Sequence, residues 1–197
     1  MTPREPRLAS TANLLGLLRI GATPVVMALL LVGGPGTGIA AAVVFSVAAA
    51  TDFLDGRIAR ARGEVSPLGI FMDLVADKVL VAGVLIAMVA VEVVPAWIAA
   101  TIVIREFVVQ SVRQLAAAEN TVISAAALGK AKTLATLAGL ALLALGTEGL
   151  FSAAGGGDAF AVIRVIGFWT LVVATVLTVV SGLDYVRGAW PILTGRP

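Results

Sequence analysis

The chain has 197 residues, of which 59% are hydrophobic and 13% charged, and its mean hydropathy is +1.04. Soluble domains carry about 25% charged residues, so this composition excludes a soluble surface and indicates a membrane protein. The chain has no cysteine and no histidine, which excludes disulfides and thiolate or imidazole chemistry, and its net charge of +2 gives no reason to expect a nucleic-acid partner.

Apolar runs separated by turn-forming residues predict an all-α integral membrane protein with six transmembrane helices. One crossing takes about 20 residues, so this length predicts a single membrane-embedded domain over residues 1–197. A short segment, 1–12, precedes the helices, which occupy about residues 14–186, and a tail, 187–197, follows them. The predicted crossings are Leu14–Val32, Ile39–Arg60, Leu68–Val91, Ala96–Ala118, Leu128–Leu145 and Ala161–Val186.

Charge asymmetry predicts the orientation of the helices. If the N-terminus is cytoplasmic, the far loops contain only one basic residue, Arg164, together with acidic residues. Cytoplasmic loops are enriched in lysine and arginine, so both termini are expected to face the cytoplasm from the cell (inner) membrane. The basic residues on that side are Arg4, Arg7, Arg60, Arg62, Arg113, Lys130, Lys132, Arg187 and Arg196.

Four aspartates stand at one end of two consecutive predicted helices. Asp52 and Asp55 are three residues apart, Asp73 and Asp77 are four apart, and each spacing puts a pair on one helix face. A short connection makes the two helices antiparallel neighbours whose acidic faces meet in one cleft. An ionised carboxylate at membrane depth costs at least about 2.5 kcal/mol. Four oxygen donors without histidine or cysteine suit divalent magnesium or manganese, and two ions fit. The alternative is a structural ion-pair network of the aspartates with Arg57, Arg60, Arg62 and Lys78.

The string Asp52-x-x-Asp55-Gly56-x-x-Ala59-Arg60, eight residues, then Gly69-x-x-x-Asp73-x-x-x-Asp77 resembles the signature of the CDP-alcohol phosphatidyltransferase family at all eight fixed positions. The resemblance implies a six-helix bundle, a homodimer, and two metal ions bound by the aspartates against the pyrophosphate of a CDP-lipid. It implies Asp52, Asp55 and Asp73 as metal ligands and Asp77 as a ligand or the general base. Gly56, Ala59, Arg60 and Gly69 are expected in the nucleotide and CDP-lipid pocket together with Asp52 and Asp55, although small residues also serve close helix packing.

Further motifs, among them Asn13-Leu14-Leu15 and Gly129-Lys130-x-Lys132-Thr133, resemble the branch of this family that uses CDP-diacylglycerol and glycerol 3-phosphate. Basic residues at the same end of the fourth and fifth predicted helices suit an acceptor that carries a phosphate. The expected acceptor-phosphate ligands are Arg105, Arg113, Lys130 and Lys132. Gly16, Leu74 and Thr136 depart from the usual pattern of that branch, and Arg57 replaces a frequent apolar residue.

Three alternatives remain at this point. A relative with the same chemistry could use inositol phosphate or phosphatidylglycerol as the acceptor. Intramembrane aspartates also mark divalent-cation and proton transporters, although those place charges near the midplane of the membrane. A structural scaffold is the third alternative, and it gives no reason for the acidic cluster.

Overall fold

The structure of the chain is a computed structural model. It describes the backbone of residues 11–62, 67–119, 127–151 and 157–194, and the side chains of these residues except 11–13, 52–62, 67–68, 70, 73, 127, 151, 157–158 and 191–194. Every element within the described ranges is an α-helix. The helices are α1 (Thr11–Val32), α2 (Thr37–Arg62), α3 (Pro67–Ala90), α4 (Ala96–Ala118), α5 (Ala127–Gly146), α6 (Glu148–Phe151) and α7 (Gly157–Thr194).

The six predicted helices correspond to α1–α5 and α7, and the predicted bounds of α4 agree with the structure. Two features were not predicted. The single turn α6 follows α5, and α7 continues through Thr194 where a tail had been expected from residue 187. Arg187 marks a change of polarity, but a charged residue does not end a helix whose backbone hydrogen bonds continue. At 1.5 Å per residue the 38 residues of α7 span about 57 Å, so α7 is longer than one crossing of a hydrocarbon core of about 30 Å requires.

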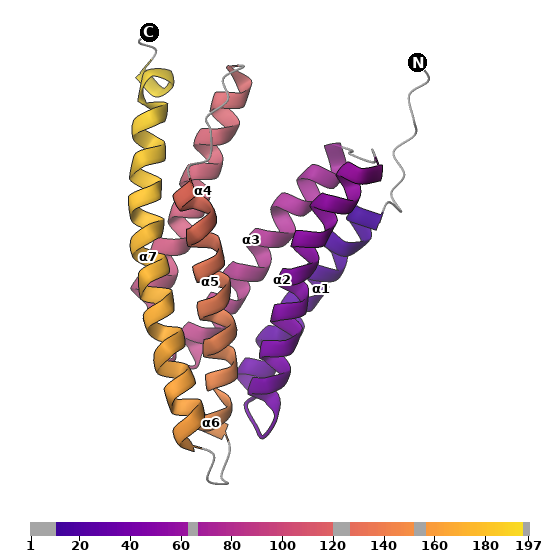
Figure 1. The fold of residues 1–197 in the computed structure, drawn as a ribbon, viewed down its shortest axis with the longest axis vertical. Helices are drawn as coiled ribbons and strands as arrows, with labels where there is room; N and C mark the ends of the chain where they lie inside the picture. Colours follow the sequence, from indigo (N-terminus) through magenta and orange to yellow (C-terminus); the bar gives the residue numbers. More distant parts are fainter. Residues whose placement is uncertain (1–10, 63–66, 120–126, 152–156, 195–197) are drawn as a thin grey trace.

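The long helices form two groups that diverge toward the chain termini (Figure 1). In the first group, α1 packs against both α2 and α3, which touch each other at only a few places. The expectation that α2 and α3 are close neighbours is therefore wrong over most of their length. Glycine contributes to the close contact of α1 with α3, because a Cβ at Gly83 of α3 would lie 2.5 Å from the Thr23 side chain of α1 and would force that side chain to shift.

The second group consists of α4, α5 and α7. Helices α5 and α7 pack closely through glycines on both sides: a Cβ at Gly139 would lie 3.0 Å from the backbone of Leu171, and one at Gly167 would lie 2.9 Å from that of Leu143. Such contacts are typical of membrane helices, where close packing replaces the hydrophobic effect between helices. Helix α4 completes the group by packing against α7.

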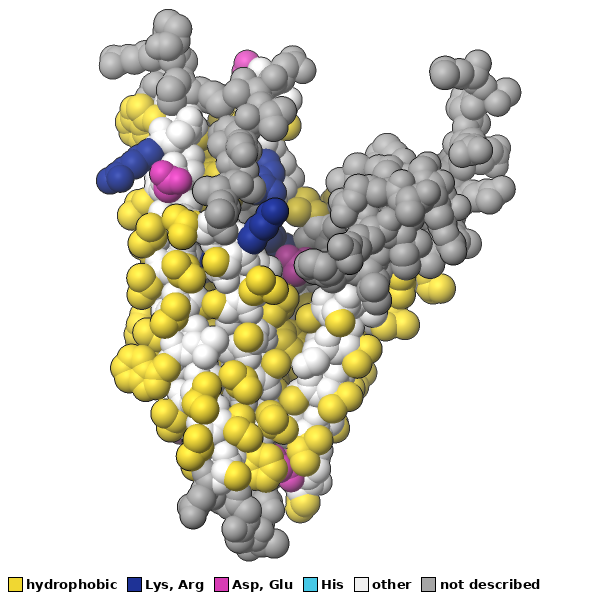
Figure 2. Space-filling model, viewed as in Figure 1, with side chains coloured by type: hydrophobic (Ala, Val, Ile, Leu, Met, Phe, Trp, Pro, Cys, Tyr) yellow, Lys and Arg dark blue, Asp and Glu magenta, His cyan; other side chains and the backbone are white. Residues whose placement is uncertain are grey.

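The two groups join at the end of the molecule away from the termini. A buried core fills this junction, with Leu30 from α1, Phe45 from α2, Met88 from α3, Ile98 from α4 and Leu140 from α5. At the opposite end the groups separate (Figure 1), and Figure 2 shows basic and acidic side chains where they part, a place that we call the notch. The notch brings parts of α3, α4 and α5 that lie far apart in the sequence to one accessible place.

Large apolar side chains are exposed on the outer faces of the helices, among them Val43, Ile86 and Trp169. Apolar side chains spread over most of the described part of the face in Figure 2. Three stretches within the described residues are long and apolar enough to cross a membrane by length and composition: Leu14–Val32, Leu128–Leu150 and Ala159–Trp190. Helix α2 contributes a shorter apolar stretch, Thr37–Thr51.

Candidate active site

The predicted acidic residues lie on α2 and α3. Helix α2 contains positions 52 and 55 near its C-terminal end, and α3 contains positions 73 and 77 in its first half. The structure describes the side chain of Asp77, and it places Gly69 in α3 as a half-buried residue. The remaining predicted ligands and pocket residues have side chains outside the described part of the chain; they are Asp52, Asp55, Gly56, Ala59, Arg60 and Asp73.

Asp77 lines a pocket of about 70 Å³ between α3, α4 and α5. Polar walls come from Asp77, Lys78, Glu106, Lys132 and Thr133, and apolar side chains such as those of Val81 and Leu137 close the pocket toward the core. The Asp77 side chain is 35% exposed, and its Oδ2 atom lies 3.7 Å from Nζ of Lys78. Asp77 is therefore accessible and stands beside a cation.

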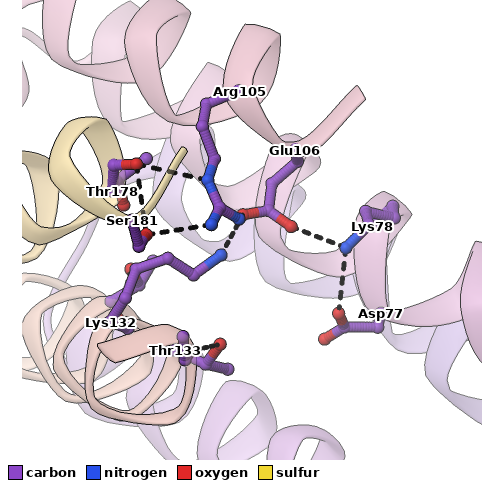
Figure 3. Close-up of polar contacts among 10 residues, drawn as sticks. Asp77, Lys78, Arg105, Glu106, Lys132, Thr133, Thr178 and Ser181 are labelled. Carbon is purple, nitrogen blue, oxygen red and sulfur yellow. Dashed lines mark hydrogen bonds and ion pairs between the residues drawn. The ribbon is translucent and has the colours of Figure 1, made fainter. Parts of the chain in front are cut away.

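Three cations surround the single carboxylate of Glu106 (Figure 3). Nζ of Lys78 donates to Oε2 of Glu106 at 2.7 Å, and Nη1 of Arg105 donates to Oε1 at 3.1 Å. Nζ of Lys132 also donates to Oε1. We call Lys78, Arg105 and Lys132 the basic cluster. Its members come from α3, α4 and α5, so Glu106 joins the two helix groups at the floor of the notch.

Helix α7 holds Arg105 in place. Nε of Arg105 donates to the carbonyl oxygen of Thr178 at 3.2 Å, and Nη2 donates to Oγ of Ser181 at 2.9 Å. A Cβ at Gly182 would lie 2.9 Å from Cγ of Arg105, so glycine makes room for this side chain. The guanidinium is thus fixed on three sides, since Glu106 provides the third contact.

The structure brings together two of the four basic residues predicted to bind phosphate, Arg105 and Lys132. It does not bring Arg113 or Lys130 into that contact: the Arg113 guanidinium lies 5.8 Å from the ring centre of Tyr185, and Lys130 is exposed. A cation over an aromatic face is a stabilising contact, which fixes Arg113 against α7.

The sequence indicated no catalytic or binding role for Lys78 or Glu106. The sequence could have pointed to both residues, because ionisable residues within apolar membrane helices are rare and are usually paired with other charges. A third residue without an assigned role is Arg19 of α1, whose side chain is fully buried. Its Nε donates to the carbonyl oxygen of Ala48 at 3.2 Å, one helical turn before Asp52. Arg19 therefore places a buried positive charge near the acidic end of α2.

Asp77 is an accessible carboxylate, the type of donor that hard divalent cations bind. Among the described residues no three acidic side chains gather in a group that could hold a metal ion. Three of the four predicted ligands have side chains outside that part of the chain.

The chain belongs to the CDP-alcohol phosphatidyltransferase family, whose family model matches residues 9–180. It is therefore an enzyme that transfers phosphatidyl groups, and with its long apolar helices it is a multi-pass membrane protein. This membership decides against the transporter and the scaffold.

Curated relatives cover most of the chain. A CDP-diacylglycerol–glycerol-3-phosphate 3-phosphatidyltransferase of Bacillus subtilis is 32% identical, covering 92% of this chain and 95% of the relative. A probable phosphatidylglycerophosphate synthase of Mycobacterium tuberculosis is 34% identical, covering 93% and 83%. A CMP-forming cardiolipin synthase of rice (Oryza sativa) is 32% identical over 97% of this chain, but over 60% of that relative.

Proposed function

We propose that this enzyme transfers the phosphatidyl group of CDP-diacylglycerol to glycerol 3-phosphate, giving phosphatidylglycerophosphate and CMP. The observation that carries the proposal is the pocket in which Asp77 stands beside the basic cluster. A carboxylate there can accept a proton, and the cations can hold a phosphate. The names of the bacterial relatives support this choice of donor and acceptor.

The donor site lies on the acidic ends of α2 and α3. Asp52, Asp55, Asp73 and Asp77 would hold two magnesium or manganese ions, with Gly56, Ala59, Arg60 and Gly69 around the nucleotide. Bound metal ions supply charge neutralisation to the pyrophosphate and to the departing CMP. The opening of the notch lets the lipid chains of the donor remain in the bilayer while the cytidine stays in water.

Asp77 is the proposed general base. The acceptor hydroxyl oxygen forms a bond to the phosphatidyl phosphorus while the bond from that phosphorus to the CMP oxygen breaks. The hydroxyl proton goes to the Asp77 carboxylate, and CMP leaves with the electron pair of the broken bond. General base catalysis of this kind contributes about 10²- to 10⁴-fold to the rate.

Arg105 and Lys132 are proposed to hold the phosphate of the acceptor, with Lys78 completing the basic cluster. Arginine and lysine form charge-assisted hydrogen bonds to phosphate oxygens. Arg113 and Lys130 stand outside this contact and are proposed to attract the anionic acceptor toward the notch. Long-range attraction raises the rate of encounter even where no direct contact is made.

We propose six crossings of the cell (inner) membrane, with the termini and the notch on the cytoplasmic side, and a homodimer as the working form. The distribution of basic residues supports the orientation. Both water-soluble substrates, the acceptor and the cytidine moiety, would then reach the site from the cytoplasm.

A second candidate keeps the chemistry and changes the acceptor to inositol phosphate or phosphatidylglycerol. The similarity to the rice cardiolipin synthase is the reason to test phosphatidylglycerol as the acceptor. The basic cluster favours a phosphorylated small molecule, since three cations around one carboxylate leave excess positive charge for the acceptor.

The test is CMP release from CDP-diacylglycerol by the detergent-purified protein, with each acceptor in turn and with magnesium or manganese. We expect metal-dependent release with glycerol 3-phosphate. Release that occurs only with another acceptor would contradict the proposed substrate and keep the family activity.

Asp77→Asn is expected to lower kcat by about 10²-fold or more, because the amide cannot take the hydroxyl proton. Asp184→Asn, the same change at an exposed position of α7, is the matched control and is expected to keep wild-type kcat. Wild-type kcat in a folded Asp77→Asn protein would rule out Asp77 as the base.

A further inference from the structure

A second hollow lies at the end of the molecule away from the termini and from the notch. Its volume is about 460 Å³, and it is formed by the turn after α3 together with α6 and α7. We call it the distal groove. We propose that it binds the head group of a zwitterionic phospholipid, with Arg164 at the phosphate and Glu92 at the ammonium group. The proposal is independent of the donor and the acceptor of the transfer reaction.

The walls of the distal groove place it at the level of lipid head groups. Leu150, Val165 and Trp169 line it and are largely exposed, Trp169 by 61%. Trp97, near the start of α4 at the same end, is exposed to the same extent. Exposed tryptophans are enriched where the hydrocarbon core of a membrane meets water. A groove with such walls at this level faces the head groups and upper acyl chains of one leaflet.

Arg164 provides the cation of the distal groove. It is half-buried, and its main chain and Cβ press on α5, because a Cβ at Gly146 would lie 2.7 Å from Cβ of Arg164. Nη1 of Arg164 donates to the carbonyl oxygen of Gly146 at 3.5 Å, which is a long contact. This contact caps the end of α5, but it uses only one of the N–H donors of the guanidinium. The others are available to a phosphate, which arginine binds through two parallel hydrogen bonds.

Glu92 provides the anion, at a position where the turn gives no reason for a glutamate. Its φ is 60°, in the left-handed region, and the N–H of Val93 donates back to the carbonyl oxygen of Met88 at 2.9 Å. Glycine is the usual residue at such a position after a helix, because it has no Cβ to strain. The Glu92 side chain is exposed and lines the groove. The turn therefore brings a carboxylate to the rim of the groove.

The two charges match a zwitterion. Among the described side chains, Arg164 and Glu92 are the only charged ones that line the groove, and neither forms an ion pair there. The Glu148 carboxylate at the same end is turned to the start of α2, where it accepts from three N–H groups. A phosphate with an ammonium group close by neutralises both charges. A purely anionic head group would pair with Arg164 but bring its charge toward Glu92.

A head group bound here would connect the two helix groups. Glu92 follows α3, which belongs to the first group, and Arg164 belongs to α7 of the second. The buried core joins the groups on the inside, and the lipid would join them on the face toward the membrane. The distal groove is thus a lipid site apart from the site of phosphatidyl transfer.

The test measures lipid binding to the delipidated protein in detergent by native mass spectrometry. The probes are dioleoyl phosphatidylethanolamine, phosphatidylcholine and phosphatidylglycerol, which share their acyl chains and differ in the head group. Arg164→Gln is expected to weaken binding of the two zwitterionic lipids about tenfold, because it removes the charge-assisted hydrogen bonds to phosphate. Arg187→Gln, at an exposed position toward the other end of α7, is the matched control and should bind them like the wild type. Equal binding by Arg164→Gln and the control would overturn the proposal.

Glu92→Gln tests the specificity. We expect the ratio of affinities for phosphatidylethanolamine and phosphatidylglycerol to shift about tenfold toward phosphatidylglycerol, because the carboxylate that attracts the ammonium and repels an anion is gone. Glu119→Gln, at the end of α4 near the notch, is the matched control and should keep the wild-type ratio. A purely structural role of Glu92 would change the affinities for all three lipids alike. An unchanged ratio in a folded Glu92→Gln protein would therefore overturn the proposal, whatever acceptor the enzyme uses.

Discussion

At the scale of single residues, the site depends on a few side chains whose places are set by neighbours without charge. Gly182 is the clearest example, because it has no chemistry of its own and still decides where Arg105 lies. The guanidinium reaches the Thr178 carbonyl and Ser181 only because α7 has no side chain at position 182. The position of Arg105 beside Glu106 therefore depends on the packing of α4 against α7 as well as on charge.

Gly182→Ala is expected to raise the KM for glycerol 3-phosphate about tenfold, since the new Cβ would displace Arg105 and a hydrogen bond to a charged group contributes about 1.5 kcal/mol or more. Steady-state kinetics in detergent would measure this. Gly188→Ala on the same helix is the control, because a Cβ there meets nothing within 4 Å. Equal KM values for the two variants would show that Arg105 does not contact the acceptor.

At the scale of elements, the end of the molecule away from the termini is fixed by a helix cap. The Glu148 carboxylate of α6 accepts from the backbone N–H groups of Gly36, Gly38 and Ile39 at 2.6, 3.1 and 3.4 Å. These N–H groups belong to the start of α2, where helical partners are missing and the helix dipole favours a negative charge. A buried Glu148 therefore ties α6 to α2 and joins the two helix groups below the notch.

Glu148→Gln should lower the free energy of unfolding by about 1–2 kcal/mol, because the amide keeps the shape but loses the charge that faces the start of α2. Thermal unfolding in detergent would report this as a lower Tm. Glu92→Gln, at an exposed position of the same end, is expected to leave Tm unchanged. If both variants melt alike, the cap does not contribute to stability.

At the scale of the whole molecule, the two ends of the helix bundle have different roles. The buried core holds the two helix groups together at one end, and their divergence at the other exposes Asp77 and the basic cluster. The proposed orientation requires the open end to face the cytoplasm. The native chain has no cysteine, so single introduced cysteines can report sidedness without background.

Glu119→Cys, just past the end of α4 at the open end, is expected to react with a membrane-impermeant thiol reagent only in inside-out vesicles. Glu92→Cys, at the opposite end, is expected to react in intact cells. Both positions are exposed, so reactivity depends on the side of the membrane and not on burial. The reverse pattern would show that the notch faces outward.

The sequence by itself determined the helices and the class of chemistry. A long apolar run predicts a helix without knowledge of the rest of the fold, since a chain in lipid must satisfy its own backbone hydrogen bonds. These runs predicted the bounds of α1–α5 and the start of α7 to within a few residues. The spacing of Asp52, Asp55, Asp73 and Asp77 is likewise local, and it led to the family that the comparison confirmed. The end of α7 was missed because a change of polarity was taken for a helix end.

Only the tertiary structure decided which helices meet and which charges share a pocket. Helix α1 packs against both α2 and α3, and its close approach to α3 at Gly83 is a property of two surfaces together. Glu106 stands 28 residues from Lys78 and 26 from Lys132, and no spacing in the chain shows that both lysines reach its carboxylate. Contacts across helices arise from packing, so the sequence could name the charged residues, while the fold decided that Lys78, Arg105 and Lys132 gather around Glu106 and that Arg113 and Lys130 lie apart from that contact.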